Sequence, residues 1–208
     1  GENIVRILPP WSKEGAFAKE CGYHYGVAER SAVACLKACK GEPCPICEAV
    51  DDLFKSRKSD NVATAKRISS KSRFLMNVLD RVAKDGKIHA LGVGPGIYED
   101  LLSIFADADY GDITDPDEGW DVKIIRKGEG LDTEYTVRPA KSPSKVMKWD
   151  EKQKKLIDLD KLVEDDIKTY DEVKNILEGV EGAEKDKEEE SEEEEEEESE
   201  EEEKESEE

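Results

Sequence analysis

Short apolar stretches separated by proline and glycine turns fill the first two thirds of the chain. Residues 4–8 (IVRIL) stop at Pro9-Pro10 and predict a first strand, and residues 17–25 predict a second. Two further pairs of apolar stretches flank glycine turns and predict β-hairpins. They are residues 74–79 with 87–93 around Asp85-Gly86, and residues 120–127 with 133–139 around Gly128-Glu129-Gly130.

Apolar residues at helical spacing mark three other stretches. Residues 48–58 and 97–105 each gather such residues on one face and predict short helices. Residues 159–180 repeat the pattern, with a candidate capping box that begins at Thr169 and a stop at Gly179. We expect the apolar stripe of this last stretch to dock on the body of the protein or on a partner.

Charge divides the chain into unlike parts. The net charge is −21, yet residues 1–149 carry 23 Lys+Arg and 23 Asp+Glu, so residues 150–208 hold the whole excess. Residues 188–208 contain 17 Glu, three Ser and one Lys, a composition that cannot form a core. We therefore predict a core of residues 1–149, an amphipathic helical or linker segment of residues 150–183 and a disordered acidic tail of residues 184–208.

The sequence carries no signals for a membrane or for secretion. No run of about eighteen apolar residues predicts a membrane span, and the absence of an apolar signal segment favours a reducing compartment. The chain begins at Gly1 directly before the first predicted strand, which indicates a piece of a longer protein.

All five cysteines and one of the two histidines lie within 27 consecutive positions: Cys21, His24, Cys35, Cys39, Cys44 and Cys47. The Cys44-Pro-Ile-Cys47 turn brings two thiolates to one cation, an arrangement typical of zinc sites. The remaining four residues of the cluster must supply two more ligands, and spacing alone leaves that choice open. A site with four protein ligands is structural, because no coordination position stays free for a substrate.

Three other interpretations of the cluster compete with zinc. Disulfides fit poorly with an odd number of cysteines, and a Cys-Pro-x-Cys redox motif needs no further thiols. A zinc nucleobase deaminase pairs His-x-Glu with Pro-Cys-x-x-Cys. Here Pro43-Cys44-x-x-Cys47 matches the Pro-Cys-x-x-Cys half of this signature. His24, however, is followed by Tyr25 and Gly26, so the glutamate that would transfer protons is missing.

Basic residues concentrate between the cysteine cluster and the first predicted hairpin. Seven stand against the single acid Asp60: Lys55, Arg57, Lys58, Lys66, Arg67, Lys71 and Arg73. The plain interpretation of such a run is a solvated loop. However, Phe74 ends the run and Tyr23 and Tyr25 flank His24, and cations beside aromatic rings are what a groove for a nucleic-acid single strand requires.

The order of several motifs resembles a known family. The motifs are Val5-Arg6-Ile7-Leu8-Pro9, His24, Cys35, Cys44-Pro45-x-Cys47, Lys66-Arg67, Arg73-Phe74-x-x-Asn77-Val78, Ile97-Tyr98-Glu99-x-Leu101 and Asp112-Ile113-Thr114-Asp115-Pro116-x-x-Gly119. Over residues 3–140 the chain resembles the single-stranded-DNA-binding proteins of T-even-type tailed phages, also called helix-destabilising proteins.

The resemblance implies a zinc-stabilised OB-fold core without catalytic activity. It implies one structural Zn²⁺ held by His24, Cys35, Cys44 and Cys47, with Cys21 and Cys39 as spare thiols. The fold class expected is thus mostly β with α: an OB-fold-like barrel, an inserted zinc-binding subdomain (residues 21–47), a C-terminal helix and the acidic tail.

The resemblance also implies partners and a location. Family members contact replication and recombination proteins through an acidic tail, although this tail is almost pure glutamate, unlike the family's mixed one. Their cooperative self-association on DNA uses a basic N-terminal segment that is absent from this chain. The implied location is the cytoplasm of the infected bacterial host, without secretion.

The resulting hypothesis is a protein that binds single-stranded DNA without sequence specificity, protecting it and keeping it unpaired during viral DNA replication, recombination and repair. Its expected DNA-binding residues are Tyr23, Tyr25, Lys66, Arg67, Lys71, Arg73, Phe74, Lys123, Arg126, Lys127 and Tyr135. The tethered acidic tail should compete with DNA for this basic surface. The alternative is a zinc-knuckle module that engages basic proteins and binds no DNA.

Overall fold

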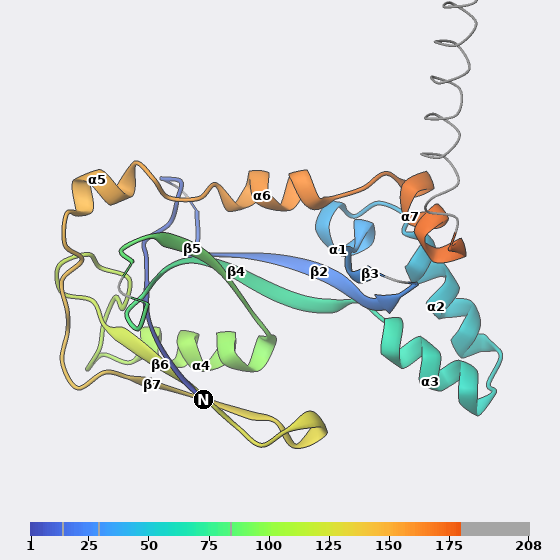
Figure 1. The fold of residues 1–208 in the computed structure, drawn as a ribbon, viewed down its shortest axis with the longest axis horizontal. Coiled ribbons are helices and arrows are strands. Elements are labelled where there is room, and N and C mark those ends of the chain that lie inside the picture. The colour runs from blue at the N-terminus through green and yellow to red at the C-terminus, as the bar shows by residue number, and fades with distance from the viewer. Residues whose placement is uncertain (14, 29, 84, 180–208) are drawn as a thin grey trace, which may run out of the picture.

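One antiparallel sheet runs through the computed structural model of the chain (Figure 1). Among the residues that the structure describes (1–13, 15–28, 30–83 and 85–179), the sheet has seven strands. They are β1 (Glu2–Ile7), β2 (Ala18–Val27), β3 (Arg30–Ala34), β4 (Lys71–Asp80), β5 (Ile88–Val93), β6 (Asp121–Lys127) and β7 (Glu134–Pro139). The helices are α1 (Leu36–Lys40), α2 (Pro45–Lys55), α3 (Ser59–Ile68), α4 (Pro95–Ala106), the 3₁₀ turn η1 (Gly130–Asp132), α5 (Trp149–Gln153), α6 (Leu159–Asp166) and α7 (Tyr170–Glu178).

Strand β4 is the centre of the sheet because three other strands pair with it. One edge of β4 pairs with β2 and then with β1, and the other edge pairs with β5. The path continues from β1 to β6 and β7. Both predicted hairpins, β4–β5 and β6–β7, are therefore confirmed, as is the mostly β character with added helices. The OB-type barrel itself stays a prediction.

The apolar residues gather in two main cores, which define two lobes. The main lobe is built from β1, β4, β5, β6, β7 and α4, and its core includes Ile7, Met76, Leu101 and Val122. The second lobe, called here the cysteine lobe, contains β3, α1, α2, α3, α7 and the end of β2. Strands β2 and β4, ten residues each, run from one lobe to the other (Figure 1).

A C-terminal strap, residues 156–178, crosses from the main lobe to the cysteine lobe (Figure 1). The buried Asn77 amide fixes its beginning, donating to the Ile157 carbonyl at 2.9 Å and accepting from the Ile157 N–H at 3.0 Å. Asp160 then accepts hydrogen bonds from Trp11 at 3.1 Å and Lys19 at 2.6 Å. The strap is thus anchored to β4, to β2 and to the segment that leads into β2.

The strap ends in α7, which completes the core of the cysteine lobe. Val173 and Ile176 are fully buried there. The predicted capping box is confirmed, since Thr169 and Glu172 cap each other's backbone groups, and Gly179 ends the helix in the left-handed region at φ 71°. The predicted apolar stripe therefore docks within the chain itself.

Several elements were not predicted from the pattern. Strand β3 and helix α1 are short, and α3 lies inside the basic run, where only Ala65 and Ile68 are buried. Helix α2 begins at Pro45, earlier than expected, because proline suits the first turn of a helix. No described helix is long and apolar enough to cross a membrane. The predicted acidic tail lies outside the described residues.

Candidate metal centre and nucleic-acid interface

Four residues from three elements meet in the cysteine lobe. His24 comes from β2, Cys35 precedes α1, and Cys44 and Cys47 stand at the start of α2. Their candidate ligand atoms all lie within 4.8 Å of one another, and His24, Cys35 and Cys44 are buried. These are the ligands that the family resemblance implies, and together they can hold a metal ion.

The spacing of these ligand atoms suits a tetrahedral ion. Cys35 Sγ lies 3.5 Å from Cys47 Sγ, and His24 Nε2 lies 3.5 Å from Cys44 Sγ and 3.7 Å from Cys47 Sγ. Zinc–sulfur bonds of 2.3 Å at tetrahedral angles place sulfurs about 3.8 Å apart. His24 Nδ1 lies 2.7 Å from the Ile68 carbonyl, which can only accept a hydrogen bond, so the proton is on Nδ1 and Nε2 is free to bind metal.

The thiols of the cluster influence each other's protonation. The hydrogen bond with Cys44, followed by one from the Ala38 N–H, lowers the pKa of Cys35 to about 5. Burial, followed by the hydrogen bond with Cys35, raises the pKa of Cys47 above its usual range. The hydrogen bond with Cys35 and then burial raise the pKa of Cys44. A bound cation would stabilise all three as thiolates.

The other two cysteines lie outside the metal cluster. Cys39 Sγ lies 3.5 Å from both the N–H and the carbonyl oxygen of Gly22, and Cys21 Sγ donates to the Arg73 carbonyl at 3.6 Å. Burial raises the pKa of Cys21 to about 11. Both thiols thus bond to backbone instead of facing the cluster.

Gly22 allows α1 to press against β2 beside the metal cluster. A Cβ atom at this position would lie 2.4 Å from the Ala38 Cβ and 2.7 Å from Ser70 Oγ. We expect Gly22→Ala to lower the free energy of unfolding by about 1–3 kcal/mol through overpacking, measured by urea denaturation. Gly96→Ala is the control, because a Cβ there meets nothing within 4 Å. Equal stability of the two variants would contradict the close packing.

The expected DNA-binding residues of the cysteine lobe and of β4 form one group. Arg73 Nε donates to the Tyr25 hydroxyl at 3.0 Å and its guanidinium lies 5.1 Å from the centre of that ring. The ring centres of Tyr23 and Tyr25 are 6.5 Å apart. Nearby, Lys71 donates to the Lys66 carbonyl and Arg67 donates to the Gly26 carbonyl, and all three of these cations are exposed.

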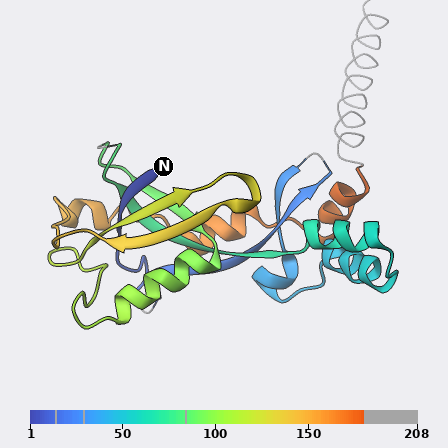
Figure 2. The same ribbon diagram turned by 90° about the horizontal axis from the view of Figure 1, so that it is seen from below.

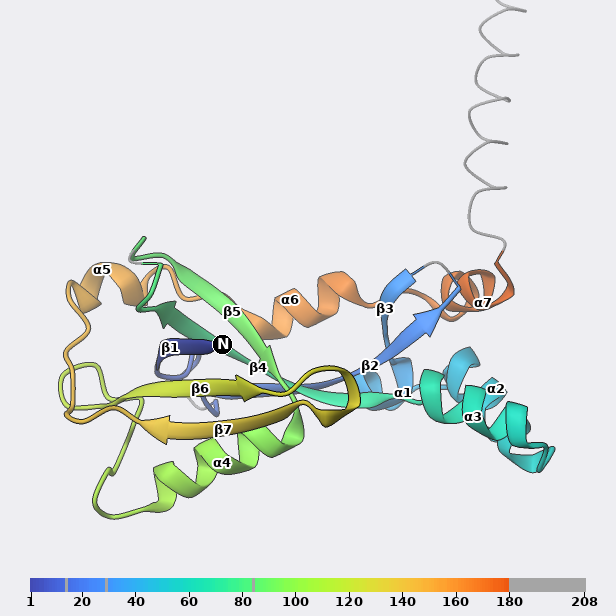
Figure 3. The same cartoon turned by 60° about the horizontal axis from the view of Figure 1, so that its bottom comes forward.

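The expected residues of the β6–β7 hairpin form a second group. Lys123 pairs with Glu2 at 3.2 Å, and Arg126 donates to Thr133 Oγ1 at 3.2 Å. Lys127 is exposed opposite Glu134, and the Tyr135 side chain is 49% exposed. Figures 2 and 3 both show α4 running along this hairpin. The second group therefore lies beside the start of α4.

Phe74 differs from the other expected aromatic residues. Its ring stacks on Tyr98 with centres 3.9 Å apart and an interplanar angle of 12°, and both rings pack against the main core. One face of Phe74 is therefore already covered. Sequence reasoning missed Tyr98 as its partner, although the helical spacing of residues 97–105 was the available signal.

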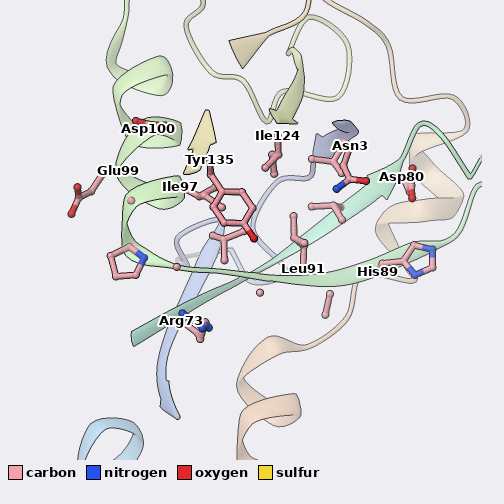
Figure 4. A pocket seen from close by; sticks show the side chains of 18 of the residues that line it. Asn3, Arg73, Asp80, His89, Leu91, Ile97, Glu99, Asp100, Ile124 and Tyr135 are labelled. Atoms are coloured by element: carbon pink, nitrogen blue, oxygen red, sulfur yellow. The ribbon is translucent and has the colours of Figure 1, made fainter. Parts of the chain in front are cut away.

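A cavity of about 930 Å³ lies between the two groups. Arg73 lines it from the first group and Tyr135 from the second, and apolar side chains between them include Leu91, Ile97 and Ile124 (Figure 4). Sequence reasoning did not find this cavity, because its lining comes from β1, β4, β5, α4, β6 and β7.

The first and the last motif of the family resemblance, residues 5–9 and 112–119, meet inside the main lobe. Arg6 is fully buried, donates from Nη2 to the Asp115 carbonyl and lies 3.9 Å from Asp121. Burial lowers its pKa. A Cβ at Gly119 would lie 2.6 Å from Arg6 Nη2, so the loop that ends the Asp-Ile-Thr-Asp-Pro motif needs glycine to close over the arginine.

Comparison with known proteins agrees with the motifs. The family model described as gp32 DNA binding protein like matches residues 1–181, and a search of curated proteins finds no match. The matched range covers both lobes and the strap, and the family consists of DNA-binding proteins, not enzymes. The chain therefore belongs to the gp32-like family of single-stranded-DNA-binding proteins.

Proposed function

We propose that this protein coats single-stranded DNA without reading its sequence, through a surface that extends from the cysteine lobe to the β6–β7 hairpin. Family membership supports the ligand class. The main support for this surface is the cavity that both Arg73 and Tyr135 line. This cavity connects two groups of cations that are far apart in the sequence. In this proposal the main lobe serves as an OB-type barrel.

The two groups have distinct tasks on the strand. Lys66, Arg67, Lys71 and Arg73 contact phosphates on one side, and Lys123, Arg126 and Lys127 do so on the other, releasing counterions. Tyr25 and Tyr135 present rings on which bases stack, which contributes about 1–3 kcal/mol per base without sequence preference. Tyr23, half-buried like Tyr25, and Phe74, which is stacked on Tyr98, add ring surface beside them.

The metal in this proposal is one structural Zn²⁺. Three thiolates and one imidazole form the ligand set that zinc prefers, and four protein ligands leave no position for catalysis. The ion would hold the end of β2, which carries Tyr23 and Tyr25, against α1 and α2. The residues on β2 therefore link metal binding to the DNA surface.

The wider role is to protect the strand and keep it unpaired during viral DNA replication, recombination and repair, in the cytoplasm of the bacterial host. Residues 184–208 would compete with DNA for the basic surface and recruit basic regions of replication and recombination proteins. Their glutamate-rich composition and their tether to the body support both tasks.

Salt dependence tests the proposed surface. Binding of a fluorescent dT oligonucleotide is measured at several salt concentrations with the unaltered protein and with Lys66→Gln/Lys71→Gln. We expect the double variant to bind more weakly and to reduce the slope of log affinity against log salt by about two, one for each lost phosphate contact. Lys161→Gln, on the exposed side of α6, is the control. An unchanged slope in the double variant would contradict the proposed surface.

A further inference from the structure

Helix α4 carries an apolar ridge that the described part of the chain leaves half covered. The side chains of Leu102 and Phe105 are 40% and 38% exposed, although both are large and apolar. Tyr98 lies on the same side of the helix, because residues three or four positions apart share a face. Tyr98, Leu102 and Phe105 are called here the α4 ridge, which spans about two helical turns.

Aromatic contacts hold the α4 ridge in place from the side of the core. The Phe17 ring stacks on Phe105 with centres 5.8 Å apart and lies 6.0 Å from the Tyr98 ring. Tyr98 in turn stacks on Phe74. Phe17 itself is buried and belongs to the main core. The ridge is therefore preorganised, and a partner that docks on it would order few side chains.

The α4 ridge faces away from the cavity that Arg73 and Tyr135 line. Asp100 lines that cavity, and at 3.6 residues per turn Asp100 and Leu102 point to nearly opposite sides of the helix. Figures 1 and 3 both show α4 running toward the end of the main lobe that is farthest from the cysteine lobe. A partner on the ridge therefore leaves the cations of the cysteine lobe open.

Carboxylates border the α4 ridge. Helix α4 contains Glu99 and Asp100 but neither Lys nor Arg, and Asp107 and Asp109 follow its last turn. The C-terminal end of a helix carries a partial negative charge, so acidic residues there are unfavourable for the helix on its own. A cation beside the end of α4 would relieve this repulsion.

The charge around the α4 ridge selects its occupant. The carboxylates repel the phosphates of DNA, and they also repel residues 180–208, whose charges are mostly negative. The cations that flank Phe17 in the sequence are Lys13 and Lys19, and Lys19 is already paired with Asp160 at 2.6 Å. A helix with one apolar face and cations along its borders matches both the ridge and the charge around it.

We propose that the α4 ridge docks a cationic amphipathic helix of a partner protein. The apolar face of that helix covers Leu102 and Phe105, and its Lys or Arg side chains pair with Asp107 and Asp109. This surface is additional to residues 184–208, which offer negative charge without any apolar side chain. Binding to those residues depends on charge and salt, whereas binding to the ridge also needs its two exposed apolar side chains.

Hydrogen exchange of the intact chain tests the docking surface with a helical peptide of Leu and Lys, about 18 residues long so that it can form a helix. We expect the peptide to slow exchange in residues 95–109. Leu102→Gln/Phe105→Gln should require about ten times more peptide for the same protection, because burial of the two side chains is lost. Leu162→Gln, at a leucine of α6 that is also 40% exposed, is the matched control.

A second variant tests the charge border without touching the apolar side chains. Asp107→Asn/Asp109→Asn keeps the size of two exposed side chains and removes their charge. We expect it to weaken protection of residues 95–109 by the Leu/Lys peptide and to unfold at a temperature no lower than that of the unaltered protein, since repulsion at the end of α4 is relieved. A peptide of Leu and Glu of the same length should give no protection.

The outcomes decide between the α4 ridge and the acidic residues 184–208. Protection of residues 95–109 that both double variants weaken and Leu162→Gln retains supports the ridge. Absence of protection there in the unaltered protein, or equal protection by the Leu/Glu peptide, would overturn the proposal. Protection that neither double variant weakens would overturn it as well. Affinity for a dT oligonucleotide should be unchanged in Leu102→Gln/Phe105→Gln, because the ridge faces away from the proposed DNA surface.

Discussion

Cys47→Ser is expected to abolish binding of the proposed metal ion and to unfold the cysteine lobe. Cys47 Sγ lies 3.5 Å from Cys35 Sγ and 3.7 Å from His24 Nε2, so its loss leaves three ligands around the ion. Structural zinc contributes on the order of 10–16 kcal/mol to the folding of zinc-finger peptides, and a missing thiolate forfeits much of this. Metal analysis should show the loss of the ion from Cys47→Ser, and thermal unfolding should show its lower stability, each in comparison with the unaltered protein.

Cys39→Ser is the matched control for this experiment. Cys39 is in the same lobe, but its sulfur bonds to the backbone of Gly22 and is not among the four clustered ligands. We expect this variant to keep its metal and most of its stability. Loss of metal from both variants, or from neither, would show that the four-residue site is wrong.

Ile176→Ala is expected to destabilise the cysteine lobe although residue 176 is far from the lobe's other residues in the sequence. The Ile176 side chain is fully buried among residues such as Val50, Ile68 and Cys44. Truncating a buried isoleucine removes packing contacts and leaves a cavity, at a cost of about 2–5 kcal/mol. Urea denaturation measures the loss, and weaker retention of the metal should accompany it.

Leu162→Ala provides the comparison for Ile176→Ala. Leu162 is on α6, in the same strap, but its side chain is 40% exposed. It therefore loses little buried surface when truncated, and we expect a change of less than about 1 kcal/mol. Similar losses for both variants would mean that α7 does not belong to the lobe's core.

The sequence predicts the elements whose signals are local. Hairpin β4–β5 follows from two apolar stretches around Asp85-Gly86, and the start of α7 follows from the capping box of Thr169 and Glu172. By contrast, α3 buries only Ala65 and Ile68, and its basic residues dominate the pattern. The helix is stabilised by packing against the rest of the lobe, and a local pattern does not record such contacts.

Residue spacing in the sequence located the metal cluster but did not decide which residues besides Cys44 and Cys47 are ligands. The family resemblance implied His24 and Cys35 as the other two. Cys35 caps α1 and Cys39 lies within it, one turn further along the same face, so the Cys39 sulfur is displaced along the helix and bonds to the Gly22 backbone instead of joining the cluster. The cavity lined by Arg73 and Tyr135 could not be predicted at all. It depends on which strands remain unpaired at the ends of the sheet, a property of the complete topology.

The contribution of α7 to the cysteine lobe has a consequence for biosynthesis. Residues from β2 to α3 are made early, whereas Val173 and Ile176 are made only after the whole main lobe has been translated. Translation proceeds at about 5–20 residues per second. For several seconds, therefore, the nascent chain contains all four candidate metal ligands but not the α7 residues that complete the apolar core of the lobe. Metal capture can precede final packing, which makes the ion a candidate for protecting the exposed core of the nascent chain.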